Sequence, residues 1–294
     1  MKRVLGVYSN PKPYWLGDGF PVRSFLYYQN QNLGTQITPF LLLQYAGPHH
    51  FEPRTVPRGI GPHPHRGFET VTIVYDGGVA HRDSMGNYGI IGPGDVEWTT
   101  AGRGIIHDEF HSPQFTKTGG PFRMIQLWIN LPAKDKRARP AYQSIVSAEI
   151  PEVELLGSDG KVRVIAGVFG GRRGPAKTFT SINVWDVRLN ADASVTLDVP
   201  DKHNSAVIVV SGRIKLAGSR AASEAEMVLL SKDGAGVALH AESDAVVLVL
   251  TGEPIDEPIA GYGPVIMNTE AEIQEAFEDL RSGRFGGPAN ASPL

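Results

Sequence analysis

"GPHPHRGFETVTIVYDG", residues Gly61–Gly77, begins with two histidines separated by one residue and continues into a run rich in β-branched residues. Side chains at alternate positions of a strand point to the same face, so His63 and His65 are expected to face together. Pro64 restricts the backbone between them. Glu69 lies four positions after His65, so on one continuous strand it would point to the same face as the two histidines. The stretch therefore indicates a strand that presents metal-binding side chains on one face.

A second pair with the same spacing lies in "GRGIIHDEF", where His107 and Glu109 are two positions apart. On neighbouring strands, the two pairs supply three imidazoles and one carboxylate, a set that suits a divalent first-row metal with open positions. A lone His-x-His pair is more often a surface or structural feature, but two pairs beside Gly-rich turns are a stronger indication. The second half of the chain has only His203 and His240, so we expect any metal in the first half alone.

The composition excludes several classes of protein. The chain has 294 residues, no cysteine, and 28 basic against 31 acidic residues. Without cysteine there is no disulfide scaffold, thiolate zinc site or iron–sulfur cluster. The charge balance argues against direct binding of nucleic acid through phosphate neutralisation. The N-terminus lacks an apolar signal-peptide core and no run approaches about 18 apolar residues, so we expect a cytoplasmic protein without a membrane span. We also expect a monomer.

Hydrophobic segments and turns divide the chain into two β-rich halves. Short strands are expected in "ETVTIVYDGG", "GIIGPGDVEWTTAG" and "FRMIQLWINLP", and at similar spacing from "VRVIAGVFG" to "AVVLVLTGEP". Such spacing is typical of β-sandwiches and barrels. We expect an N-terminal domain over residues 1–134, a charged linker over 135–150 and a C-terminal domain over 151–294. "TIVYDGGVAHRD" resembles "VIVVSGRIKLAG", which favours an internal duplication, although turn-rich β sequences also resemble one another by chance.

The last part of the chain has helical periodicity instead. In "NTEAEIQEAFEDLRSGRFGG", Asn268 or Thr269 is a suitable N-cap and Gly283 a suitable end. The apolar residues at helical spacing are Ile273, Ala276, Phe277 and Leu280. We expect an amphipathic helix that packs on a barrel at the end of the C-terminal domain.

Four segments together carry a family resemblance. "HPHRGFETVT", "HRDSMGN", "GPGDVEWTTAGRGIIHDE" and "GEPIDEPIAGYGPVIMNT" resemble the pirin family of the cupin superfamily. The match is dense from about Gly61 to Leu131 and returns near the C-terminus, and it is weaker over residues 1–58 and 150–200. The resemblance implies an all-β bicupin: two jelly-roll-like cupin β-barrels face to face, one metal in the N-terminal barrel, and a C-terminal α-helix.

The resemblance also implies a ligand set. By position, the family's four ligands fall on His63, His65, His107 and Glu109. Parity alone also allows Glu69, because a glutamate at this offset after His-x-His is the ligand in germin-like cupins. The pirin pattern assigns the role to Glu109 and leaves Glu69 as a structural group that can orient a ligand imidazole. We therefore predict Glu109 as both a metal ligand and the catalytic base.

The function implied by the resemblance is metal-dependent oxidation. The family is known for iron binding, for quercetin 2,3-dioxygenase activity in several members and for a transcription-cofactor role in eukaryotes. This favours Fe(II) as the single divalent metal, although Mn, Ni, Co, Cu and Zn also accept these ligand types. We expect a dioxygenase that cleaves a flavonol or a similar aromatic enol with O2. Two alternatives stay open: a metal-dependent regulatory protein with a protein partner, and a different small-molecule enzyme on the same fold.

Other residues are expected to have structural roles. His81 is expected beyond a hairpin near the barrel mouth, where a surface position is favoured over contact with substrate. His111 is expected either as a proton carrier near the site or on a mobile loop. Trp98, Met124 and Trp128 are expected in the barrel core, where one of them also suits the wall of a site for a flat aromatic substrate.

Overall fold

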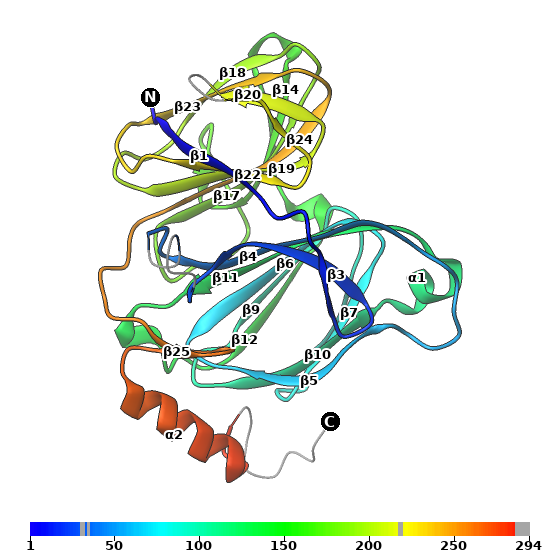
Figure 1. Ribbon diagram of the computed structural model, residues 1–294, viewed down its shortest axis with the longest axis vertical. Helices are drawn as coiled ribbons and strands as arrows, with labels where there is room; N and C mark the ends of the chain where they lie inside the picture. The colour runs from blue at the N-terminus through cyan, green and yellow to red at the C-terminus, as the bar shows by residue number, and fades with distance from the viewer. Residues whose placement is uncertain (30–32, 34–35, 217–219, 286–294) are drawn as a thin grey trace. The chain divides into compact units, whose positions relative to one another are not determined.

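The computed structural model describes residues 1–29, 33, 36–216 and 220–285, and these form two compact β-rich units (Figure 1). Each unit contains one seven-stranded and one four-stranded antiparallel sheet. Among the described residues, no helix has the length and apolar character needed to cross a bilayer. Of the described residues, we call those within 12–35, 40–147 and 255–285 the first barrel, and those within 1–11, 36–39 and 148–254 the second barrel.

The first barrel holds the stretch quoted at the start. Its seven-stranded sheet has the order β12 (Ala141–Ile145), β9 (Val96–Thr100), β6 (Phe68–Asp76), β11 (Gly120–Asn130), β4 (Phe40–Phe51), β3 (Phe20–Tyr27), β2 (Tyr14–Leu16). Its four-stranded sheet has the order β5 (Gly59–His65), β10 (Ile105–His111), β7 (Val79–Asp83), β8 (Tyr88–Ile91). The other elements are α1 (Pro113–Thr118), a 3-10 turn (Ala133–Asp135), β25 (Ala260–Tyr262), β26 (Val265–Met267) and α2 (Glu270–Arg281).

The second barrel repeats this architecture. Its seven-stranded sheet has the order β1 (Val4–Ser9), β22 (Glu226–Leu230), β19 (Asn204–Ser211), β24 (Ala245–Gly252), β17 (Ile182–Leu189), β14 (Gly160–Ala166), β13 (Glu152–Glu154). Its four-stranded sheet has the order β18 (Ser194–Asp198), β23 (Gly236–Ala241), β20 (Arg213–Leu216), β21 (Ala222–Ser223). The smaller elements are β15 (Val168–Phe169), β16 (Arg172–Arg173) and 3-10 turns at Ser147–Glu149 and Leu156–Ser158.

The strand orders of the two barrels match. The run β9-β6-β11-β4-β3 corresponds, in chain order, to β22-β19-β24-β17-β14, and β5-β10-β7-β8 corresponds to β18-β23-β20-β21. Chance similarity between turns does not produce the same pairing order in both sheets. The topology therefore supports the internal duplication that the sequence favoured.

The two interiors differ in chemistry. The second barrel is filled by a continuous cluster of aliphatic side chains around Trp185. The first barrel has smaller apolar clusters and buries several polar side chains, among them His65, His107, Glu109 and Gln126. Buried polar groups cost free energy unless they are paired. Their concentration in one barrel therefore indicates that the functional chemistry lies there.

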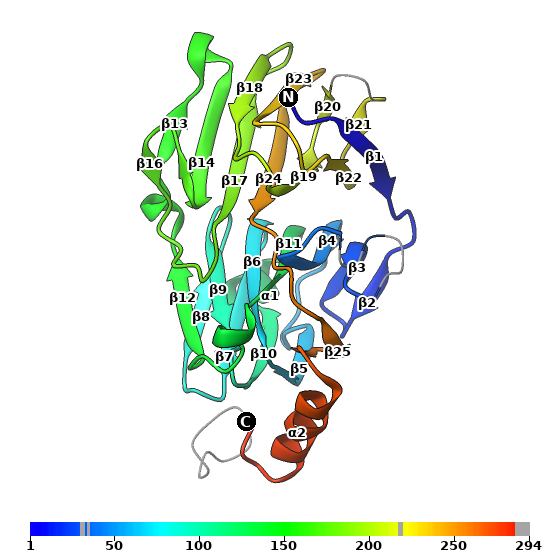
Figure 2. The same cartoon turned by 90° about the vertical axis from the view of Figure 1, so that its left-hand side faces the viewer.

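The contacts divide the chain differently from the boundaries expected from sequence. The first 11 residues belong to the second barrel, because β1 pairs with β22. The stretch expected as a linker, 135–150, contains β12, which adds an edge strand beside β9 of the first barrel (Figure 2). An edge strand buries only part of its surface, and its sequence therefore carries little periodicity. These are long-range pairings that local patterns do not report.

The C-terminal helix forms over the expected residues, but it packs on the first barrel. Thr269 is its N-cap: the Thr269 side chain accepts from the Glu272 N–H, and the Glu272 carboxylate accepts from the Thr269 N–H. Ile273 and Ala276 are buried against β25 and β26. Arg66, just after β5, donates to the Asp279 carboxylate of the helix at 2.8 Å. Helix α2 therefore braces the strand that carries His63 and His65.

A buried lysine joins three segments of the first barrel. Lys136 Nζ donates to the carbonyl oxygens of Gly67 and Ile266, both at 2.9 Å, and to Asn130 Oδ1 at 2.5 Å. Burial lowers the pKa of Lys136 to about 7, because the charged form loses solvation. The three acceptors match the three ammonium protons. This contact fixes the turn between β5 and β6.

We expect Lys136→Met to lower the free energy of unfolding by about 2–4 kcal/mol, because it leaves three buried acceptors without a donor. Urea unfolding followed by circular dichroism measures the change. Lys134→Met is the matched control, because the Lys134 side chain is 80% exposed, and its effect should stay below about 0.5 kcal/mol. Equal destabilisation by both substitutions would contradict the role of Lys136.

Candidate metal centre

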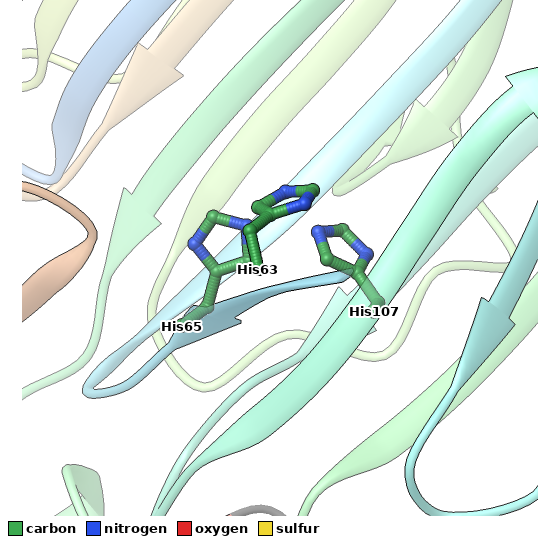
Figure 3. Close-up of side chains that lie close together, drawn as sticks. All are labelled: His63, His65 and His107. Carbon is green, nitrogen blue, oxygen red and sulfur yellow. The ribbon is translucent and has the colours of Figure 1, made fainter. Parts of the chain in front are cut away.

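Strand pairing brings the two sequence pairs onto one face of the four-stranded sheet. β5 and β10 are antiparallel, with His107 opposite His63 and Ile105 opposite His65. Ligand atoms of the three histidines lie within 4.8 Å of one another, and the rings converge (Figure 3). The structure thus brings His107 together with His63 and His65, although 42 positions of sequence separate it from His65.

Burial favours the neutral form of the three rings. Burial lowers the pKa of His63 and lowers the pKa values of His65 and His107 well below their usual range, because the charged ring loses solvation. His63 Nδ1 lies 2.9 Å from the carbonyl oxygen of Gly61, which suits an N–H donor and leaves Nε2 as the acceptor nitrogen. His107 Nε2 is buried and has no hydrogen-bond partner. Neutral imidazoles with available nitrogens are the form that binds metal ions.

A β-bulge separates Glu109 from the register of the histidines. The pairing of β10 with β5 shifts between His107 and Glu109. The Glu109 carboxylate accepts hydrogen bonds from Gln126 Nε2 at 3.2 and 3.3 Å and from Thr72 Oγ1 at 3.3 Å. Both donors lie on the seven-stranded sheet, so the carboxylate is held between the two sheets.

The Glu109 carboxylate lines the same cavity as His63 and His65, but it lies outside the group of atoms that are within 4.8 Å of one another. Burial raises the pKa of Glu109 to about 7, and the negative charge of Glu97 acts in the same direction. A carboxyl group that is near half-ionisation at neutral pH is suited to accept and return a proton.

Glu69 points away from Glu109. The even spacing from His63 and His65 had instead suggested that Glu69 shares their face. The chain turns at Gly67, where φ is +88°, so the alternation of side chains restarts in β6. Thr72 contacts Glu109 from one face of β6, and Glu69 has the opposite parity. The Glu69 carboxylate accepts instead from Thr100 Oγ1 at 2.7 Å. Burial raises the pKa of Glu69 to about 7.

A cavity of about 500 Å³ adjoins these side chains. This volume is within the range of small-molecule sites, about 300–1,000 Å³. Met124 and Trp128, expected in the core, are buried and also line the cavity, whereas Trp98 is fully buried elsewhere. Tyr14, which is 43% exposed, lines the cavity as well. The cavity therefore reaches solvent and can admit a ligand.

His81 is buried, whereas the sequence predicted a surface position. β7 is an inner strand between β10 and β8, and its pairing places His81 opposite Glu109. Asp83 Oδ2 lies 3.2 Å from His81 Nε2, and Glu97 Oε1 lies 2.9 Å from His81 Nδ1. Tyr142 stacks on the ring with centroids 4.9 Å apart. The inner position of β7 is the physical reason for the burial.

His107 connects this cluster with the three-histidine group. Its Nδ1 lies 3.3 Å from His81 Nδ1, and ligand atoms of His81, Glu97 and His107 also lie within 4.8 Å of one another. Polar contacts behind a ligand imidazole orient the ring and fix its tautomer. The two-residue spacing of His81 and Asp83 indicates only that these two side chains share a face of a strand, not that they meet Glu97 and His107. Glu97 carries no comparable signal.

His111 is a core residue at the end of β10. It is 3% exposed, its Nε2 lies 2.9 Å from the carbonyl oxygen of Gly19, and its ring stacks on Phe122. The predicted position on a mobile loop was therefore wrong, because β10 extends through this residue. His111 does not line the cavity, which also argues against the alternative role as a proton carrier.

Comparison with known proteins finds similarity along the whole chain. The family model described as Pirin matches residues 21–129, and the model described as Pirin C-terminal cupin domain matches residues 184–286. A Pseudomonas aeruginosa protein named "Putative quercetin 2,3-dioxygenase" is 52% identical over 285 residues, which cover 97% of this chain and 99% of that protein. Pirin-like protein 2 of Arabidopsis thaliana is 37% identical, and the match covers 92% of this chain and 81% of that protein.

A solved structure gives the same result. The crystal structure of a quercetin 2,3-dioxygenase from Acinetobacter baumannii is 47% identical, has a TM-score of 0.93, and matches 97% of this chain and 99% of its own. At this level of identity and coverage, the likeness extends to the arrangement of both barrels' strands and is not limited to one motif.

His81, Asp83 and Glu97 form a group, the His81 cluster, that should make the free energy of unfolding depend on pH. Burial acts to lower the pKa of His81, but the hydrogen bonds with Asp83 and Glu97 outweigh it and raise the pKa to about 10 from 6.5. The folded state therefore binds the proton more tightly than the unfolded state. Its contribution to stability is fully present below pH 6.5 and is lost as pH rises through about 10.

We compare the free energy of unfolding of wild type with that of His81→Gln, both without metal. The difference should shrink by about 1 kcal/mol per pH unit between pH 6.5 and about pH 10. Urea unfolding at a series of pH values measures it, with the exposed His50→Gln as the control. A difference that stays constant with pH would show that His81 is not charged in the folded protein.

Proposed function

The chain belongs to the pirin family, and we propose that it is a mononuclear metal-dependent dioxygenase that cleaves quercetin-type flavonols or similar aromatic enols with O2. The observation that carries the proposal is the group of three converging imidazoles, two of which, His63 and His65, line one largely apolar cavity together with Glu109. Two relatives that bear the name quercetin 2,3-dioxygenase match nearly the whole chain. Flavonols are flat and largely apolar, as the cavity walls require.

We propose His63, His65, His107 and Glu109 as the ligands of one divalent ion. The buried, unpartnered Nε2 of His107 and the lowered pKa values of the three rings support this set. Imidazole and carboxylate ligands accept Fe(II), Mn, Co, Ni, Cu and Zn, and the family resemblance makes Fe(II) our first choice. When bound, the ion supplies positive charge that makes an enol oxygen of the substrate easier to ionise.

Glu109 is the proposed base. Its carboxylate lines the cavity beside His63 and His65, where it can accept the proton of an enol hydroxyl. Gln126 and Thr72 donate to its oxygens and orient the group. The apolar walls exclude water while the substrate reacts. In the overall reaction the flavonol takes up O2 and loses one ring carbon as carbon monoxide.

Cytoplasmic location and a monomeric state remain predictions from the sequence. The regulatory role also remains an alternative. It predicts that a protein partner binds the Fe(II)- and Fe(III)-loaded forms with different affinity, and that flavonols are not turned over.

We expect His107→Ala and Glu109→Gln each to weaken Fe(II) binding at least about tenfold, because each removes a ligand. Anaerobic titration against a coloured chelator measures the affinity. Glu69→Gln and the exposed His50→Ala are controls that should bind nearly as wild type does. Unchanged affinity in the Glu109 variant would refute its role as a ligand, and a loss in the Glu69 variant would assign that role to Glu69.

We expect protein loaded anaerobically with Fe(II) to consume O2 and to remove the visible absorbance of quercetin, and a chelator to abolish the reaction. Glu109→Gln should lower kcat by roughly 100-fold or more, because it removes the base. Absence of metal-dependent turnover with Fe, Mn, Co, Ni and Cu would contradict the proposed reaction.

A further inference from the structure

Polar side chains cross the seven-stranded sheet of the first barrel in one row. Strand pairing places Gln126 of β11 opposite Gln44 of β4, and Gln44 opposite Ser24 of β3. Residues opposite one another in an antiparallel sheet lie on the same face. The row begins beside Glu109, which Gln126 contacts, and runs toward the edge strand β2. It therefore leads from the proposed base along one wall of the cavity.

The far end of the row is a hydrogen-bonded group that we call the Tyr14 cluster, made of Tyr14, Ser24 and Gln44. Gln44 Nε2 donates to Tyr14 Oη at 2.6 Å and to Ser24 Oγ at 3.1 Å, and the two hydroxyl oxygens are 2.9 Å apart. All three side chains line the cavity. Gln44 is 4% exposed and Tyr14 is 43% exposed. The cluster therefore lies where the cavity meets solvent.

The remaining walls limit the chemistry of a ligand at this end. Tyr27, Leu42, Met124 and Trp128 supply flat or apolar surface, and none of the described residues that line the cavity is a lysine or an arginine. A carboxylate or phosphate would lose solvation there without a cation to pair with. A phenolic hydroxyl both donates and accepts, as the hydroxyls and the amide of the cluster do. The wall thus fits a neutral, flat, hydroxylated aromatic group.

We propose that the Tyr14 cluster is a second polar subsite, which binds hydroxyl groups at the end of the substrate remote from its enol. The proposal rests on the proposed function, because that function places the enol beside Glu109. It narrows the substrate class from flavonols in general to flavonols with hydroxyl groups on the side ring.

The test compares quercetin with galangin, a flavonol that differs from quercetin only in lacking the hydroxyl groups on the side ring, which is the phenyl substituent or B ring. Binding to metal-free protein is measured by quenching of tryptophan fluorescence, and KM and kcat are measured on metal-loaded protein. Tyr14→Phe should weaken quercetin binding roughly two- to tenfold, the effect of one hydrogen bond, and raise KM more than it lowers kcat. Galangin should show a much smaller change. Gln44→Leu should give the same pattern.

Controls separate this role from a structural one. Tyr88→Phe changes a tyrosine that is 61% exposed and outside the cavity, and should alter neither flavonol. Thermal unfolding shows whether each variant is folded. If Tyr14→Phe or Gln44→Leu is not folded, Ser24→Ala, which changes the third member of the cluster, is tested in its place. Equal weakening of both flavonols, or a wild type that binds both equally tightly, would overturn the subsite. Selective binding without turnover would keep the subsite and overturn the proposed reaction.

Discussion

The site depends on the register between β5 and β10. That pairing sets His63 opposite His107 and directs the two-residue repeat of each strand to the same side of the sheet. A shift by one residue would turn these imidazoles to the other face. β7 extends the same sheet and places His81 behind His107. The neighbouring strands therefore place a histidine ring on each side of His107, His63 from β5 and His81 from β7.

The matching barrels show how one strand order supports two interiors. The second barrel packs aliphatic side chains throughout its core, which is the stable solution for two facing sheets. The first barrel instead buries histidines, carboxylates and amides, and some of these are paired across the gap between its sheets, as Glu109 is with Gln126 and Thr72. Polar burial of this kind lowers stability and is retained where it serves a function.

Local patterns predicted the parts of the molecule that depend on near neighbours. The His-x-His spacing located His63 and His65, and the Thr269 capping pattern located α2. The parity of Glu69 was misleading because one turn, at Gly67, restarts the alternation. The burial of His81 depends on strands that approach from elsewhere in the chain, as does the pairing of β1 and β12. No local pattern carries that information.

Crystals soaked anaerobically with Fe(II) and measured with X-rays on both sides of the iron absorption edge test the central claim most directly. The account predicts one anomalous peak among the nitrogens of His63, His65 and His107, with the Glu109 carboxylate as a further ligand. A peak among His81, Glu97 and His107, the other group whose ligand atoms lie within 4.8 Å of one another, would contradict it. So would the absence of any peak in the first barrel.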